Sequence, residues 1–124
     1  MIGEGARSRL ARRHRLRGAA AFAAVFRRGL RLEGERLQLV ALPTDGAGRV
    51  GYVIGRKLLA RAVDRNRLRR MLREVIRTRR AATSAFDVIV RLRRPCGAKD
   101  FAGAVAEASA LLDALGSRGT ATSR

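Results

Sequence analysis

Residues 61 to 80 show a helical alternation of apolar and basic positions. Apolar side chains recur there at spacings of three and four, which on a 3.6-residue period places them on one side of a helix. These side chains are Leu68, Met71, Leu72, Val75 and Ile76. Arginines four residues apart lie on the other sides, and Asp64 before them is the candidate N-cap. We therefore expect one side of this helix to pack and the rest to present guanidinium groups.

Shorter patterns predict five further elements. They are a helix at 19–28 closed by Gly29, strands at 37–42, 50–54 and 86–92, and an amphipathic helix at 100–115. The first two strands are separated by a loop rich in turn residues, so we expect them to form an antiparallel hairpin. The order helix, strand, strand, helix, strand, helix is typical of an α+β domain with helices packed on a sheet.

The two ends of the chain lack an apolar face. Residues 1–12 are rich in Gly and Arg and are expected to form a mobile basic arm, which either orders on a nucleic-acid backbone or makes no defined contact. Residues 13–116 are predicted to be a single domain, because a chain of 124 residues has room for only one. Residues 117–124 are small and polar, and we expect a disordered tail there.

Positive charge dominates the composition. Lys and Arg number 28 against 10 Asp and Glu, which gives a formal net charge of +18. Such a field repels itself in the folded state, so it favours a strongly negative partner: nucleic acid, an anionic membrane or an acidic protein. No apolar run approaches the roughly 20 residues that span a membrane, and a signal-peptide pattern is missing. We expect a cytoplasmic protein without a membrane partner, and the single Cys96 fits a reducing compartment.

The arginines of the 61–80 helix narrow the choice of partner. Like charges four residues apart repel each other, and only Asp64 and Glu74 relieve them within this segment. A solvated helix face normally mixes both signs, although a merely soluble face stays an alternative interpretation. Arginine suits bidentate contact with phosphate and stacking on bases, so we interpret this helix as binding a nucleic acid.

Candidate catalytic groups are sparse. Cys96 and His14 are each the only residue of their kind, so neither a Cys/His zinc site nor a Cys-His nucleophile pair can be built from them. The ten acidic residues are scattered, and none forms the paired spacing of a metal-binding or acid/base dyad among the arginines. A glycine-rich phosphate loop is missing as well. The residues indicate a binding protein rather than a protein-only nuclease.

Two phenylalanines, Phe22 and Phe26, share one face of the 19–28 helix. A Phe pair at helical spacing usually belongs to the core. The alternative is that at least one ring borders a groove and stacks on bases, as in proteins that bind single strands. The pattern alone leaves both interpretations open.

Several motifs in a fixed order resemble one known family. The segment 62–74 reads Ala-Val-Asp-Arg-Asn-Arg-Leu-Arg-Arg-Met-Leu-Arg-Glu, in which an Arg-Asn-Arg triplet opens a basic helix. Upstream lie Arg15-Leu-Arg17, Phe22, Phe26, Gly29, Val50-Gly51 and Gly55-Arg56-Lys57, and downstream lie the strand 87–90, Arg93 and Pro95. This combination resembles the bacterial ribonuclease P protein subunit over roughly residues 13 to 115.

The resemblance implies a small two-layer α/β sandwich with a mixed sheet, in which the arginine helix crosses between parallel strands with the uncommon left hand. It implies a subunit that helps a catalytic RNA to remove the 5′ leader of precursor tRNA. The RNA, not this chain, would then perform the cleavage and require Mg²⁺, with no cofactor bound by the protein alone. The chain would be monomeric within the complex. The alternative is a general RNA-binding or ribosome-associated protein without a role in cleavage.

The resemblance also implies roles for individual residues. Those expected to bind the catalytic RNA are Arg56, Lys57, Arg61, Arg65, Asn66, Arg67, Arg69, Arg70 and Arg73. Those expected to bind the leader are Arg15, Arg17, Phe22, Phe26 and Arg36. Members of the family commonly have aromatic residues in the strand after the first helix, where this chain has Leu37 and Val40. Val40 is the position that we match to a leader-stacking aromatic, and Arg36 or Arg56 would compensate for its loss electrostatically.

Overall fold

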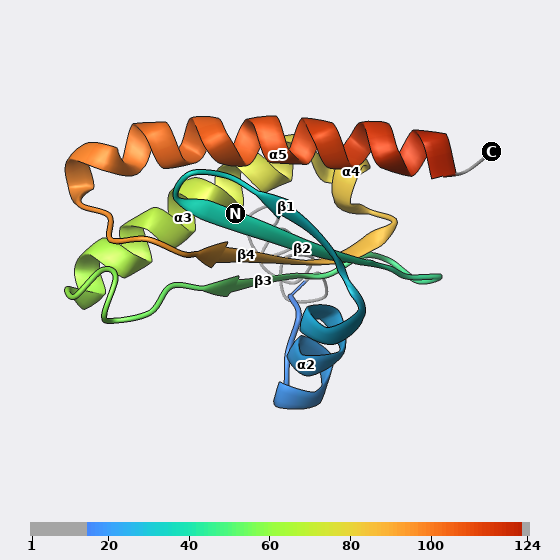
Figure 1. Cartoon of the computed structure of the whole chain (residues 1–124), viewed down its shortest axis with the longest axis horizontal. Coiled ribbons are helices and arrows are strands. Elements are labelled where there is room, and N and C mark those ends of the chain that lie inside the picture. The colour runs from blue at the N-terminus through green and yellow to red at the C-terminus, as the bar shows by residue number, and fades with distance from the viewer. Residues whose placement is uncertain (1–14, 123–124) are drawn as a thin grey trace, which may run out of the picture.

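The computed structural model describes residues 15–122 of the chain, with side chains up to residue 117. Labelled as in Figure 1, the elements in chain order are α2 (Ala19–Arg28), β1 (Leu30–Glu33), β2 (Leu37–Pro43), β3 (Val50–Val53), α3 (Ala62–Thr78), α4 (Arg80–Thr83), β4 (Phe86–Leu92), a 3₁₀ turn η1 (Ala98–Asp100) and α5 (Phe101–Thr122). The described strands form one sheet in the order β1-β2-β4-β3. The predicted α+β class, with helices on a mixed sheet, is confirmed.

Strand pairing differs from the sequence prediction. The expected hairpin of residues 37–42 with 50–54 is wrong, because β4 lies between β2 and β3, antiparallel to β2 and parallel to β3. The hairpin partner of β2 is β1, which the sequence analysis missed. Val88, Ile89 and Val90 are all buried, so β4 needs neighbours along both edges and cover on both faces. That requirement puts β4, rather than β3, beside β2.

Helices cover both faces of the sheet (Figure 1). On one face, α3 and α5 enclose the larger core, which includes Leu39, Val88, Leu68, Leu72, Phe101 and Leu112. On the opposite face, α2 packs through Val25 against Val40 and Ile89, with Leu16 from the segment before it. In addition to the two layers that the resemblance implies, the structure therefore has a third, small layer formed by α2. Its origin is the run of consecutive apolar residues in β2 and β4, which makes each strand apolar on both faces.

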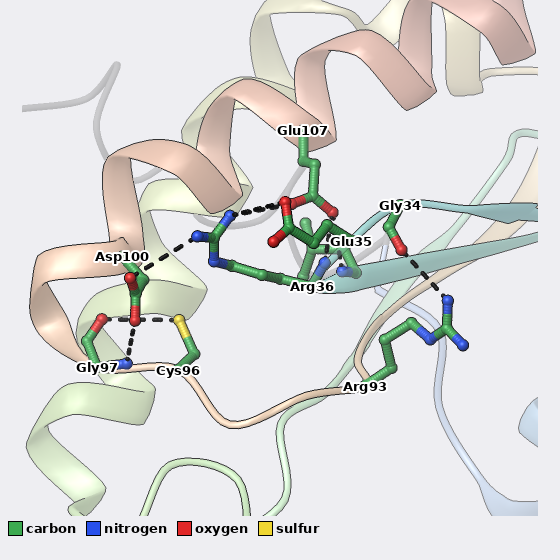
Figure 2. Close-up of polar contacts among 9 residues, drawn as sticks. Gly34, Glu35, Arg36, Arg93, Cys96, Gly97, Asp100 and Glu107 are labelled. Carbon is green, nitrogen blue, oxygen red and sulfur yellow. Dashed lines mark hydrogen bonds and ion pairs between the residues drawn. The ribbon is translucent and has the colours of Figure 1, made fainter.

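Glu107 attaches α5 to the turn between β1 and β2 (Figure 2). Its carboxylate accepts hydrogen bonds from the backbone N–H groups of Arg36 at 2.8 Å and Leu37 at 3.0 Å. The Arg36 guanidinium lies 3.5 Å from the same carboxylate and 3.8 Å from Asp100. Backbone donors on a largely buried carboxylate make strong, charge-assisted bonds. This end of α5 is thereby fixed over the sheet, and the Arg36 side chain is held on the α5 face.

A buried cysteine lies close to this network (Figure 2). Cys96 is free, and burial raises the pKa of its thiol. Nearby, Arg93 donates to the carbonyl of Gly34 at 3.2 Å, which ties the end of β4 to the same turn. The thiol is therefore a packed side chain rather than an activated nucleophile.

The helix boundaries correct two further expectations. Asp64 is not the N-cap, because α3 begins at Ala62 with Arg61 as its cap residue and no side-chain capping bond. The backbone N–H groups of Asp64 and Arg65 both bond to the Arg61 carbonyl, so the first turn forms earlier than predicted. Asp64 within that turn still complements the helix dipole.

At the other end of the chain, α5 continues to Thr122 and replaces most of the expected tail, since each added residue gains a helical hydrogen bond. The expected arm at 1–12 lies outside the described residues.

Candidate nucleic-acid interface

The solvent side of α3 forms an open hollow of about 420 Å³. Its lining residues are Val63, Asn66, Arg69, Arg70 and Arg73. The opposite side of the helix is buried through Leu68, Leu72, Val75 and Ile76, as the periodicity predicts. Four of the expected RNA-binding residues, Asn66 among them, therefore meet in one concave surface.

Three basic side chains of the Arg-Asn-Arg region have partners within the protein. Arg65 donates to the carbonyls of Leu59 at 3.0 Å and Ala60 at 2.7 Å, which fixes the loop before the helix. The guanidinium of Arg67 lies 5.5 Å from the ring centroid of Phe101, a cation–π contact with α5. Arg69 donates to Asn66 Oδ1 at 2.8 Å. Asn66 lies inside the helix, so it does not cap the N-terminus.

Other cations of this region remain without a neutralising partner. Among the residues that the structure describes, Arg56, Lys57, Arg70 and Arg73 form no ion pair, and Arg61 approaches Asp64 only to 3.9 Å while its side chain stays 75% exposed. The distal half of α3 differs, because Arg77 is paired with Glu74 at 2.5 Å. Just beyond the helix, Arg79 is paired with Asp113 at 3.1 Å. Within the α3 region the cations without an ion pair thus lie in the first half of the helix and the loop before it, where an external anion can bind.

Tyr52 links α3 to the edge strand β3. Burial is the largest influence on its hydroxyl and raises the pKa of Tyr52 to about 12, against the opposing positive charges of Arg73, Arg15 and Arg69. Tyr52 therefore lies among guanidinium groups from two separate parts of the chain. Sequence analysis missed this residue as part of the site. Its place in a predicted strand indicated burial, but the strand pattern does not tell which helix the ring faces.

The aromatic pair lies on the other face of the sheet and is half-buried. Phe22 and Phe26 pack at the border of the small cluster under α2. The ring of Phe22 lies so close to Gly51 of β3 that a Cβ there would be 2.4 Å from the ring, so only glycine fits. Arg91 of β4 lies 5.8 Å from the ring centroid of Phe26. Each ring thus packs on the sheet and is only partly buried, so neither ring is a fully buried core residue, and stacking on bases stays a prediction.

The remaining residues that are expected to bind the leader lie in different parts of the structure. Arg15 and Arg17 are exposed beside the start of β3, where the backbone N–H of the intervening Leu16 bonds to the Val50 carbonyl at 2.9 Å. Arg36 is not brought to the aromatic pair, because its guanidinium lies on the α5 face among carboxylates. Val40 is fully buried under α2, so a side chain at this position cannot stack on a base of the leader. The expected compensation for an aromatic at position 40 therefore does not come from Arg36.

The part of the chain that the structure describes holds neither a metal-binding cluster nor a membrane-spanning helix. Within residues 15–122, no three His, Cys, Asp or Glu side chains gather in a way that could hold a metal ion. Over the same residues, no helix is long and apolar enough to cross a membrane.

Comparison with known proteins identifies similar chains. The family model described as Ribonuclease P matches residues 10–116. The ribonuclease P protein component of Nitrosomonas eutropha is 37% identical over 101 residues, which cover 79% of this chain and 84% of the relative. The RNase P protein from Thermotoga maritima has a similar structure, with a TM-score of 0.67 and 27% identity over 79% of this chain and 96% of that chain. A Staphylococcus aureus RNase P protein mutant with defective mRNA degradation activity has a TM-score of 0.75 over 86% of this chain and 92% of that chain, and its 22% identity supports the fold alone.

The burial of Tyr52 predicts a pH dependence of stability. The pKa of Tyr52 in the folded protein, about 12, exceeds the ordinary 10.0. The contribution of the protonated hydroxyl to the free energy of unfolding is therefore fully present below pH 10 and is lost as the pH rises toward 12. Tyr52 is the only tyrosine and the chain has no tryptophan, so tyrosinate absorbance reports on this residue alone. We expect the native protein to titrate well above the urea-unfolded protein, and Tyr52→Phe to remove this part of the pH dependence. A native midpoint equal to the unfolded one would mean that the hydroxyl is solvated.

Proposed function

Because the chain belongs to the ribonuclease P protein family, we propose that it binds the catalytic RNA of this tRNA-processing ribonuclease through α3 and the 5′ leader of precursor tRNA beside α2. Membership makes the chain a subunit of ribonuclease P and the RNA its partner. The division into two contact surfaces is our proposal, and it rests on the placement of the charged and aromatic residues described above.

The observation behind the RNA surface is the unneutralised charge at the start of α3. Arg70 and Arg73 share the hollow with Asn66, and the preceding loop adds Arg56 and Lys57. Cations that lack a carboxylate partner gain most from phosphate, because binding releases the counterions condensed on the RNA. In this proposal Arg65 and Arg67 act mainly by fixing the loop and α5 on either side of the RNA surface, since both already have intramolecular partners.

The leader is proposed to run along the sheet face that α2 only partly covers. The exposed parts of Phe22 and Phe26 offer stacking surfaces, and Arg91 beside Phe26 offers a charge to the leader backbone. Arg15 and Arg17 would extend this path at the start of β3. Stacking tolerates any base, which suits a substrate segment whose sequence differs between tRNAs. With Val40 buried and Arg36 on the α5 face, we leave both residues out of the proposed path.

We assign the cleavage step to the RNA and a supporting electrostatic role to the protein. Positive side chains placed against RNA phosphates replace part of the cation atmosphere that the folded RNA otherwise needs. The protein would thereby lower the Mg²⁺ concentration at which the RNA and its substrate assemble, without binding Mg²⁺ itself. We further propose that one copy acts in each complex and that the complex works in the cytoplasm.

The proposed RNA surface predicts a difference between two arginines of the same helix. Arg70→Ala should weaken binding to ribonuclease P RNA and make the log-log salt dependence shallower by roughly 0.7 to 0.9 for each phosphate that the variant no longer neutralises. Arg77→Ala is the matched control, because Glu74 already neutralises Arg77, and it should leave the slope nearly unchanged. Affinities measured over a series of KCl concentrations give both slopes. Equal slopes for the two variants and the wild type would contradict the assignment of α3 to the RNA.

The proposed leader path predicts a selective effect of Phe26. Phe26→Ala should stay folded and lose about 1 to 3 kcal/mol of binding to precursor tRNA with a leader of several nucleotides, while binding to mature tRNA stays unchanged. Val25→Ala is the control on the same helix: Val25 is only 1% exposed, so its truncation should lower the free energy of unfolding without separating the two substrates. An equal loss for both substrates in Phe26→Ala would instead favour a general RNA-binding protein.

A further inference from the structure

Val63 is an exposed apolar residue in a basic surface. Its side chain is 57% exposed in the first turn of α3, and the only other large hydrophobic residue exposed in the described part of the chain is Leu30, at 37%. Single exposed apolar residues are common and need no explanation by themselves. Val63 differs because it lines the hollow formed with Asn66, Arg69, Arg70 and Arg73.

The spacing of the lining residues places apolar and polar groups in one row. Val63, Asn66, Arg70 and Arg73 are separated by three, four and three residues, so they follow one another along one side of the helix. Asn66 lines the hollow, and its Oδ1 already accepts a hydrogen bond from Arg69, so its amide N–H₂ group is the part of the side chain that can donate to a bound group. A bound group would therefore meet methyl groups at one end, an amide donor next to them and two guanidinium groups at the other end.

These chemical features match a single nucleotide better than a duplex backbone. An A-form duplex presents phosphates and 2′-hydroxyls to a protein and would leave the Val63 methyl groups unused. An unstacked nucleotide in a loop or bulge offers an apolar base face, base acceptors and a phosphate together. The volume of about 420 Å³ lies within the range of roughly 300 to 1,000 Å³ that is usual for sites of small ligands.

We infer that the hollow on α3 binds one unstacked nucleotide of the catalytic RNA, with its base against Val63, a base acceptor at Asn66 and its phosphate at Arg70 and Arg73. This inference rests on the proposed function and adds a site to it. Val63 then contributes affinity by excluding water from a base, which differs in kind from the charge-dependent contribution of the arginines.

The test compares Val63→Ala with Leu30→Ala in binding to ribonuclease P RNA. Val63→Ala removes two methyl groups but no charge, so affinity should fall about fivefold while the salt slope stays that of the wild type. Its melting temperature should not fall, because an exposed helix position favours alanine. Val63→Thr keeps the shape but replaces a methyl group by a hydroxyl, and it should lose affinity as well. Leu30→Ala, on β1, should bind as the wild type does.

Arg70→Ala measured in the same series separates the possible failures. If Arg70→Ala weakens binding and Val63→Ala does not, the nucleotide site is wrong and the RNA surface stands. If neither variant changes the affinity, α3 is not the RNA surface and the proposed function loses its basis there. A Val63→Ala variant that also changes the salt slope would mean a disturbed helix, and that result would overturn the nucleotide site too.

Discussion

The burial of β4 on both faces is the constraint on which the rest of the architecture depends. Its central residues Val88, Ile89 and Val90 are all removed from solvent, so one face needs α3 and α5 and the other needs α2. Both edges of β4 are paired as well, which leaves β3 at the edge of the sheet. As a result β3 separates the two proposed contact surfaces, with Gly51 under the ring of Phe22 on one face and Tyr52 among the arginines on the other.

The positive charge of this protein is neutralised in some parts of the fold and not in others. A net charge of +18 opposes folding, and the structure relieves it unevenly. Carboxylates neutralise arginines near the end of α3 and around the β1–β2 turn, as in the pairs of Arg77 with Glu74 and of Arg36 with Glu107. The first turns of α3 are left uncompensated. In the proposed function, a polyanion bound there would relieve this repulsion at the place where the hollow lies.

The sequence predicted those features that depend on local periodicity, and it failed where distant segments compete. The arginine helix and its buried side follow from spacing alone, and so do the strands 37–42 and 86–92. Pairing order could not be predicted, because whether β2 joins β3 or β4 depends on burial of both faces of β4, which a single strand does not reveal. Likewise the resemblance implies a leader role for Arg36, but it does not reveal that Glu107, 71 residues away, holds this side chain on the opposite face. Tyr52 was missed for the same reason, since its guanidinium neighbours come from other elements.

The central claim is that this chain assists an RNA catalyst and does not cleave RNA by itself. The most direct measurement follows precursor tRNA cleavage against Mg²⁺ concentration for ribonuclease P RNA alone, for the RNA with this protein, and for the protein alone. The account predicts that the protein shifts RNA-dependent cleavage at the mature 5′ end to lower Mg²⁺ and that the protein alone leaves the substrate intact. Cleavage at that position by the protein without RNA, or an Mg²⁺ requirement that the protein does not change, would contradict it.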